Sequence, residues 1–263
     1  MTGPGHPIAH VIGAILSDAR EHTRLTLDEA TDHLGTGAGR VGHIETGRLS
    51  ATSHELQRLC DLYGVPEQAP ALHQLAEGRW HPAAGGDARA VPRADRDSGF
   101  ADRLAAVARQ SVRVRWLSTH LVPPPLQTPA YATAVHQPIP ARPWPELRRQ
   151  DVVVLDESVV RRGKATAGLM CDQISHLLTL QCAGAQIHVA PALFPPGSYA
   201  ELTLQSAVMV VVSGGFTDAV YQATTALATH IDHALADPDP DPDRSRRLLT
   251  EAYAHHRSHG EAR

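Results

Sequence analysis

Residues 24–48 constrain the fold more than any other stretch of this 263-residue chain. Thr26 and Glu29 have the T-x-x-E spacing of a capping box, in which the two side chains accept hydrogen bonds from free backbone N–H groups at a helix start. Three apolar residues follow at helical spacing: Leu27, Ala30 and Leu34. Gly35 predicts the end of this helix, and a second short helix is expected to end within residues 44–48. The segment therefore predicts two short helices joined by a tight turn.

Three further helices are predicted around this pair, over residues 8–22, 53–64 and 66–76, and each has an apolar face. The layout resembles the Cro/repressor-type helix-turn-helix of xenobiotic-response-element (XRE) regulators, whose second helix often closes with I-E-x-G. Ile44, Glu45 and Gly47 match that ending. The resemblance implies a five-helix DNA-binding domain of a bacterial transcription regulator.

The surface chemistry of the expected recognition helix is poor. Base contacts need long polar side chains, and phosphate contacts need arginine or lysine. Within residues 36–44, positions 37, 39 and 42 are glycine and position 38 is alanine. Each glycine inside a helix costs about 1 kcal/mol relative to alanine, so three of them weaken this helix by about 3 kcal/mol. We expect only Arg40 and His43 to contact base edges, and Arg48 to contact a phosphate.

The charge of the N-terminal region also opposes DNA binding. Residues 1–75 contain five arginines, no lysine and nine acidic residues, a formal net charge of −4. A negative domain repels the phosphate backbone that supplies most non-specific affinity. Two interpretations remain: the domain binds DNA weakly or only with a partner, or it is a retained scaffold that no longer contacts DNA.

The composition divides the chain into two domains. Residues 78–98 are rich in glycine, proline, alanine and charge, which predicts a flexible linker between a domain over 1–77 and a second over 99–263. The second domain is predicted to be mixed α/β, which makes the whole chain α+β. Its expected elements include a strand over 151–162 with acidic residues at its end and a long helix over 217–238.

The second domain resembles the domain of unknown function that follows the helix-turn-helix in a large group of antitoxin-like regulators of high-GC bacteria. The matching positions are Leu126, Gln127, Thr128, Tyr131 and Ala132, then Leu155, Asp156, Glu157 and Arg161, and finally Gln173 and Leu177. Pro124 and Pro125 replace a Gly-Leu pair that is usual in the group. The resemblance implies a domain that senses a signal or docks a small acidic partner protein, in a homodimer.

Polar residues of the first and third matching segments are candidates for a ligand or partner pocket. Gln127, Thr128 and Tyr131 either line a cleft with hydrogen-bonding groups or form a turn and cap the helix that follows. Gln173, on a predicted amphipathic helix, is assigned to the same pocket by the resemblance. The residues alone leave both interpretations open.

Acidic residues at the end of the predicted strand are the other pocket candidates. Asp156 and Glu157 either lie at the mouth of a pocket, together with Arg161, or form ion pairs with Arg161 or Arg162. Adjacent residues on a strand point to opposite faces, so Asp156 and Glu157 are not expected to act as paired catalytic carboxylates.

No motif predicts a cofactor or a metal. His230 and His233 are three residues apart on a predicted helix, but no third ligand at a typical spacing accompanies them. The sequence has no P-loop, no nucleophile elbow and no dinucleotide-binding glycine motif after a strand. The three cysteines are widely scattered, and we expect them to be reduced and buried.

The remaining features indicate a cytoplasmic protein. The chain has no apolar run of the ~18 residues that a membrane span needs. Its first residues also lack the basic region with which a signal peptide begins. The first hypothesis is a regulator with weakened DNA contacts whose second domain senses a ligand or partner. An alternative is a family scaffold that binds an apolar small molecule and catalyses a cyclisation or isomerisation in secondary metabolism. A third is an interaction module that titrates another regulator.

Overall fold

A computed structural model describes residues 7–77, 92–163, 165–190, 197–205, 208–213, 218–222, 228–236 and 242–260. The chain forms two compact units. The first unit comprises residues 1–112, 202–211 and 218–224, and the second comprises residues 113–201, 212–217 and 225–263. Residues 78–91 of the predicted linker lie outside the described residues.

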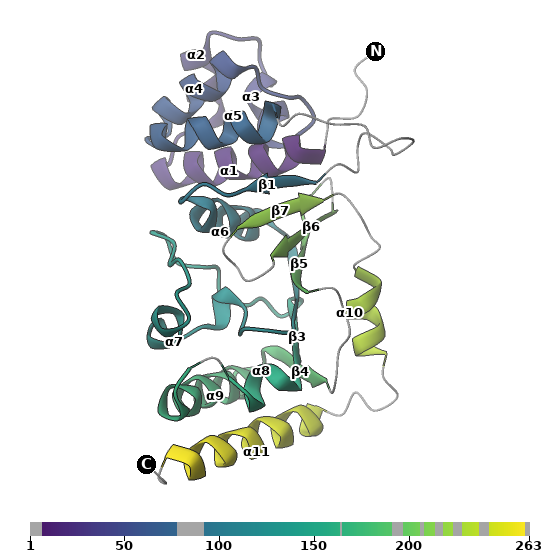
Figure 1. The fold of residues 1–263 in the computed structure, drawn as a ribbon. Coiled ribbons are helices and arrows are strands. Elements are labelled where there is room, and N and C mark those ends of the chain that lie inside the picture. The colour runs from purple at the N-terminus through teal and green to yellow at the C-terminus, as the bar shows by residue number, and fades with distance from the viewer. Residues whose placement is uncertain are drawn as a thin grey trace, which may run out of the picture. The chain divides into compact units, whose positions relative to one another are not determined.

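Helices make up the described part of residues 1–77, as the sequence predicts. They are α1 (Pro7–Thr23), α2 (Leu27–Leu34), α3 (Arg40–Glu45), α4 (Ser53–Leu62) and α5 (Ala69–Glu77), with a 3-10 turn at Pro66–Gln68 (Figure 1). Complete capping boxes start two of them, Thr26 with Glu29 before α2 and Thr52 with Glu55 before α4. These reciprocal hydrogen bonds explain why both helix starts can be located from sequence alone.

The prediction that three glycines weaken the recognition helix is wrong. Of the three, only Gly42 lies inside α3; Gly37 precedes it, and Gly39 is its N-cap residue. Gly39 has φ 81°, and Gly35, which ends α2, has φ 67°. Glycine adopts this left-handed conformation at little cost, so these two glycines build the turn. The expected weakening falls to about 1 kcal/mol, from Gly42 alone.

The first unit also contains α6 (Phe100–Gln110) and a strand pair. Strand β1 (Arg93–Asp95) pairs antiparallel with β7 (Ala219–Gln222), and β6 (Val208–Ser213) follows β7 in the sheet order. Residues 93–95 of the predicted linker are therefore part of a sheet. Helix α6 packs against α1, and Arg109 of α6 forms a bidentate ion pair with Asp18 of α1 at 2.8 and 2.9 Å.

The long helix predicted over residues 217–238 is wrong. Residues 219–222 form β7, and a separate helix, α10, covers Ala228–Leu235. In β7, Ala219 and Tyr221 are buried whereas their neighbours are half-exposed. That alternation suits a strand with one face in the core. Pairing with the distant β1, which local spacing does not reveal, selects the strand.

The second unit is mixed α/β, as predicted. Strands β2 (Arg113–Ser118), β3 (Val152–Asp156) and β4 (Gln186–Ala190) are parallel neighbours, and β5 (Ser198–Thr203) follows β2 on its other side. Helices α9 (Ala167–Cys182) and α11 (Pro242–Gly260) pack side by side and contact β4 (Figure 1). The buried run Val153–Leu155 fits a central parallel strand covered on both faces.

Candidate functional site

The surface of α3 carries fewer available cations than predicted. Arg40 forms a bidentate ion pair with Glu55 of α4, in which Nη2 donates to Oε2 at 2.9 Å and Nε donates to Oε1. The contact holds the N-terminus of α3 against α4. It also occupies two of the guanidinium donors that the sequence analysis assigned to a base edge.

His43 and Arg48 are the predicted contacts that stay exposed. Among the described residues, neither side chain has a hydrogen-bond or ion-pair partner. Nearby helix α2 presents three exposed acidic residues, Asp28, Glu29 and Asp32. The residues assigned to DNA therefore offer one exposed imidazole and one exposed guanidinium, and the neighbouring helix carries several carboxylates.

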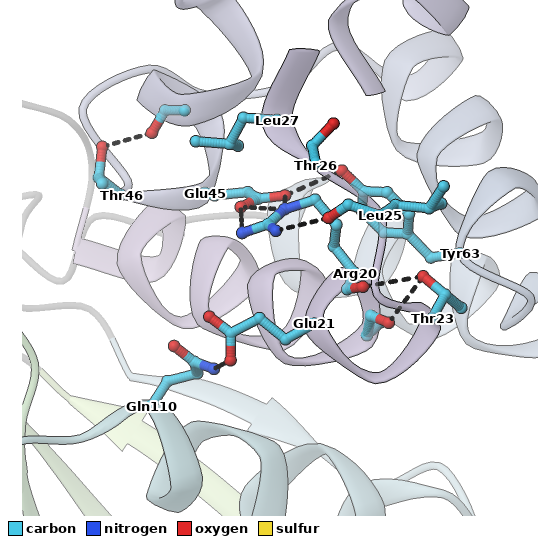
Figure 2. Close-up of polar contacts among 12 residues, drawn as sticks. Arg20, Glu21, Thr23, Leu25, Thr26, Leu27, Glu45, Thr46, Tyr63 and Gln110 are labelled. Carbon is cyan, nitrogen blue, oxygen red and sulfur yellow. Dashed lines mark hydrogen bonds and ion pairs between the residues drawn. The ribbon is translucent and has the colours of Figure 1, made fainter. Parts of the chain in front are cut away.

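A buried ion pair fixes the C-terminal end of α3. Arg20 of α1 donates from Nε to both oxygens of Glu45, at 2.9 and 3.0 Å, and from Nη2 to Oε2 at 2.9 Å (Figure 2). The Tyr63 hydroxyl donates to Oε1 of Glu45 at 2.8 Å. Burial, with the nearby Glu45 carboxylate as the next cause, raises the pKa of Tyr63 above its usual range. The hydroxyl is therefore a permanent donor to Glu45.

Close backbone packing fixes the same end of α3. Gly13 of α1 lies so near that a Cβ added there would overlap the backbone carbonyl oxygens of Ile44 and Glu45. Gly47, with φ 70°, lies equally close to His10. The sequence analysis gave no role to Arg20, Tyr63 or Gly13, because their partners lie 18 or more residues away along the chain.

Arg48 lines a polar hollow of about 410 Å³ in the first unit, together with Thr46 of the α3 C-cap. Glu21 of α1 lines the same hollow and accepts a hydrogen bond from the Gln110 amide at 2.8 Å (Figure 2). A carboxylate that shares this hollow lowers the positive potential that the guanidinium can present to a phosphate.

Acid is expected to remove the Arg40–Glu55 contribution to stability. Hydrogen bonds from Arg40 and then Thr52 lower the pKa of Glu55 from 4.5 to about 2. Because the folded pKa is depressed, the stabilisation is complete above pH 4.5 and is lost as the pH falls toward 2. The Arg40 side chain is 35% exposed, so solvent screening reduces the contribution to about 1 to 2 kcal/mol. The unfolding free energy of the unmodified chain should fall as the pH drops below 4.5. In Arg40→Gln, chemical denaturation should show a fall that is smaller by about 1 to 2 kcal/mol. An unaltered pH profile would contradict this role of the pair.

The first predicted pocket group of the second unit holds its own loop together. Gln173 is fully buried; its Oε1 accepts from the Thr128 N–H and its Nε2 donates to the Leu126 carbonyl, both at 2.8 Å. Thr128 caps α7 (Pro129–Ala134) by accepting from the Tyr131 N–H at 3.2 Å. Gln127 donates to the Val122 carbonyl at 2.7 Å. These contacts agree with the turn-and-cap interpretation, and the pocket role of the four residues stays a prediction.

The predicted strand over residues 151–162 is too long. Strand β3 ends at Asp156, whose side chain accepts from the Ser158 N–H at 2.8 Å and caps helix α8 (Glu157–Arg161). Glu157 and Arg161 therefore lie one helical turn apart and form an ion pair, one of the alternatives left open. Arg161 also contacts Glu251 of α11 at 3.3 Å.

Within the described residues, no group of three His, Cys, Asp or Glu side chains is placed to hold a metal ion.

Cys60 is buried, and burial raises the pKa of its thiol to about 12. Cys182 is exposed at the end of α9, so the expectation of three buried cysteines is wrong. In the part of the chain described, no helix has the length and hydropathy to cross a membrane.

Comparisons with known proteins support both parts of this description. A family model described as a helix-turn-helix domain matches residues 11–73. A second model, described as a domain of unknown function (DUF5753), matches residues 101–251. No curated protein and no solved structure matched the chain. The matched helix-turn-helix supports a DNA-binding transcription regulator. Since the second model covers more than half of the residues, the chain belongs to the family that carries this domain of unknown function (DUF5753), here joined to an N-terminal helix-turn-helix.

Proposed function

We propose that this protein is a transcription regulator whose helix-turn-helix makes only a few contacts with DNA. The observation that carries the proposal is the pairing of Arg40 with Glu55, which leaves His43 and Arg48 as the exposed basic side chains of this surface. His43 then contacts a base edge and Arg48 a phosphate. The ordered turn and the anchored end of α3 argue for a preserved binding element rather than a decayed scaffold.

The second domain, residues 99–263 in this proposal, supplies the signal by binding a ligand or a partner protein. We further propose that the regulator acts as a homodimer. Two copies double the small number of cationic side chains that meet a two-fold symmetric site, which partly offsets the acidic charge of each helix-turn-helix.

Substitution of Arg48 tests the assigned surface. Arg48→Ala is expected to reduce the salt dependence of binding to DNA from upstream of the gene. The slope of log affinity against log salt should change by about 1 for each phosphate that the substitution leaves without its arginine. Fluorescence anisotropy with labelled duplex at several salt concentrations measures this slope.

Arg40→Gln is the matched comparison for Arg48→Ala. Because Arg40 is engaged by Glu55, its removal is expected to lower stability and leave the salt slope unaltered. Equal slopes for Arg48→Ala and the unmodified chain, in protein that still binds, would contradict the assigned surface. The surface would be equally contradicted if Arg40→Gln alone reduced the slope.

A further inference from the structure

A cavity of about 890 Å³ in the second unit has the dimensions of a small-molecule site. The segment from Trp144 to Arg149 forms one part of its lining, and Leu126 with His176 and Leu180 of the C-terminal half of α9 forms another. None of the residues that the sequence analysis assigned to a pocket lines it.

The family-matching residues hold one wall of this cavity in place. The two hydrogen bonds of Gln173 fix the backbone of the loop at Leu126 and at Thr128. On the other wall, the Gln186 amide donates to the Arg149 carbonyl at 2.6 Å. Because these hydrogen bonds hold the backbone of the lining segments in place, the site is preformed. A preformed site lowers the entropy cost of binding.

The side chains that line the cavity combine an aromatic ring with positive charge. Trp144 packs edge-on against the buried Trp116, with ring centroids 6.1 Å apart. Among the described residues, neither the Trp144 indole N–H nor the Arg149 guanidinium has a polar partner. Arg148, Arg149 and His176 outnumber the one acidic lining residue, Glu146.

We propose that this cavity binds a small organic anion that carries an aromatic ring. The ring packs on Trp144 and the neighbouring leucines, and the anionic group accepts charge-assisted hydrogen bonds from Arg149. The inference rests on the proposed function, because it names the ligand class to which the second domain responds. The ligand then contacts the lining of this cavity rather than the pocket residues that the sequence analysis assigned.

Two fluorescent dyes with the same ring system test the charge requirement in the full chain. The probe 8-anilinonaphthalene-1-sulfonate carries an anionic group, and N-phenyl-1-naphthylamine is its neutral counterpart. In titrations of dye fluorescence, Arg149→Gln is expected to weaken sulfonate binding about tenfold and leave neutral-dye binding unaltered. Trp144→Ala should weaken both dyes.

Arg162→Gln is the matched control, because Arg162 is an exposed arginine of the same unit that does not line the cavity. Equal sulfonate affinity in the Arg149 and Arg162 variants would overturn the site. DNA anisotropy with and without the sulfonate separates the two proposals. A dye effect on DNA affinity that Arg149→Gln abolishes supports both. Binding that depends on Arg149 without any effect on DNA keeps the site and rejects the signalling role.

Discussion

Replacement of Arg20 by methionine is expected to lower the free energy of unfolding by about 3 to 5 kcal/mol. Arg20 neutralises Glu45, whose side chain is only 5% exposed. Without the guanidinium, the buried carboxylate keeps the Tyr63 hydroxyl but has no cation beside it. An unpaired buried charge is far more costly than a broken ion pair at the surface. Chemical denaturation of the variant and the unmodified chain measures the difference.

Two further variants make the Arg20 result specific. Arg24→Met removes an exposed arginine that directly follows α1. It should change the unfolding free energy by no more than about 0.5 kcal/mol. The double variant Arg20→Met with Glu45→Gln removes both charges and keeps a side-chain oxygen as acceptor for the Tyr63 hydroxyl, so it should recover most of the stability. A double variant as unstable as Arg20→Met would show that packing of the arginine stem, rather than the ion pair, stabilises the end of α3.

Gln173→Leu is expected to destabilise the second unit by about 2 to 4 kcal/mol. Leucine has a similar volume, so the main effect is the removal of the hydrogen bonds to Leu126 and Thr128. The Leu126 carbonyl and the Thr128 N–H would then lack the hydrogen-bond partner that the fully buried Gln173 side chain provides. Denaturation followed by tryptophan fluorescence measures the effect, since Trp116 and Trp144 both belong to this unit.

The control for Gln173→Leu is Gln57→Leu on α4. Gln57 is exposed, and within the described residues its side chain bonds only to Asp61, four residues along the same helix. Its replacement should change stability by less than about 0.5 kcal/mol. If Gln173→Leu is equally mild, the loop at residues 121–131 does not depend on this glutamine, and the support inferred for the cavity wall is wrong.

Local signals in the sequence were sufficient for the helical region. The capping boxes at Thr26 and Thr52 and the left-handed Gly35 act within a few residues, so spacing alone locates the ends of α2 and the start of α4. The glycine-rich stretch was misleading because glycine has two roles. Spacing does not distinguish Gly39, which forms the turn, from Gly42, which lies in the helix.

Contacts between distant segments account for the other errors and omissions. Strand β7 depends on pairing with β1, more than a hundred residues earlier. Arg40 is engaged in an ion pair with Glu55, and Glu45 in one with Arg20. Sequence periodicity predicts neither ion pair. The family resemblance identified Gln173 as important, but only its buried hydrogen bonds indicate that it supports a loop.

The salt dependence of DNA affinity tests the central claim most directly. Anisotropy titrations of the full chain with upstream duplex, over a range of salt concentrations, give the slope of log affinity against log salt. With the one phosphate contact proposed for each chain, at Arg48, the homodimer should show a slope of about −2. A slope of about −6 or steeper would require many more cationic side chains at the DNA backbone, and it would contradict a helix-turn-helix with so few available basic side chains.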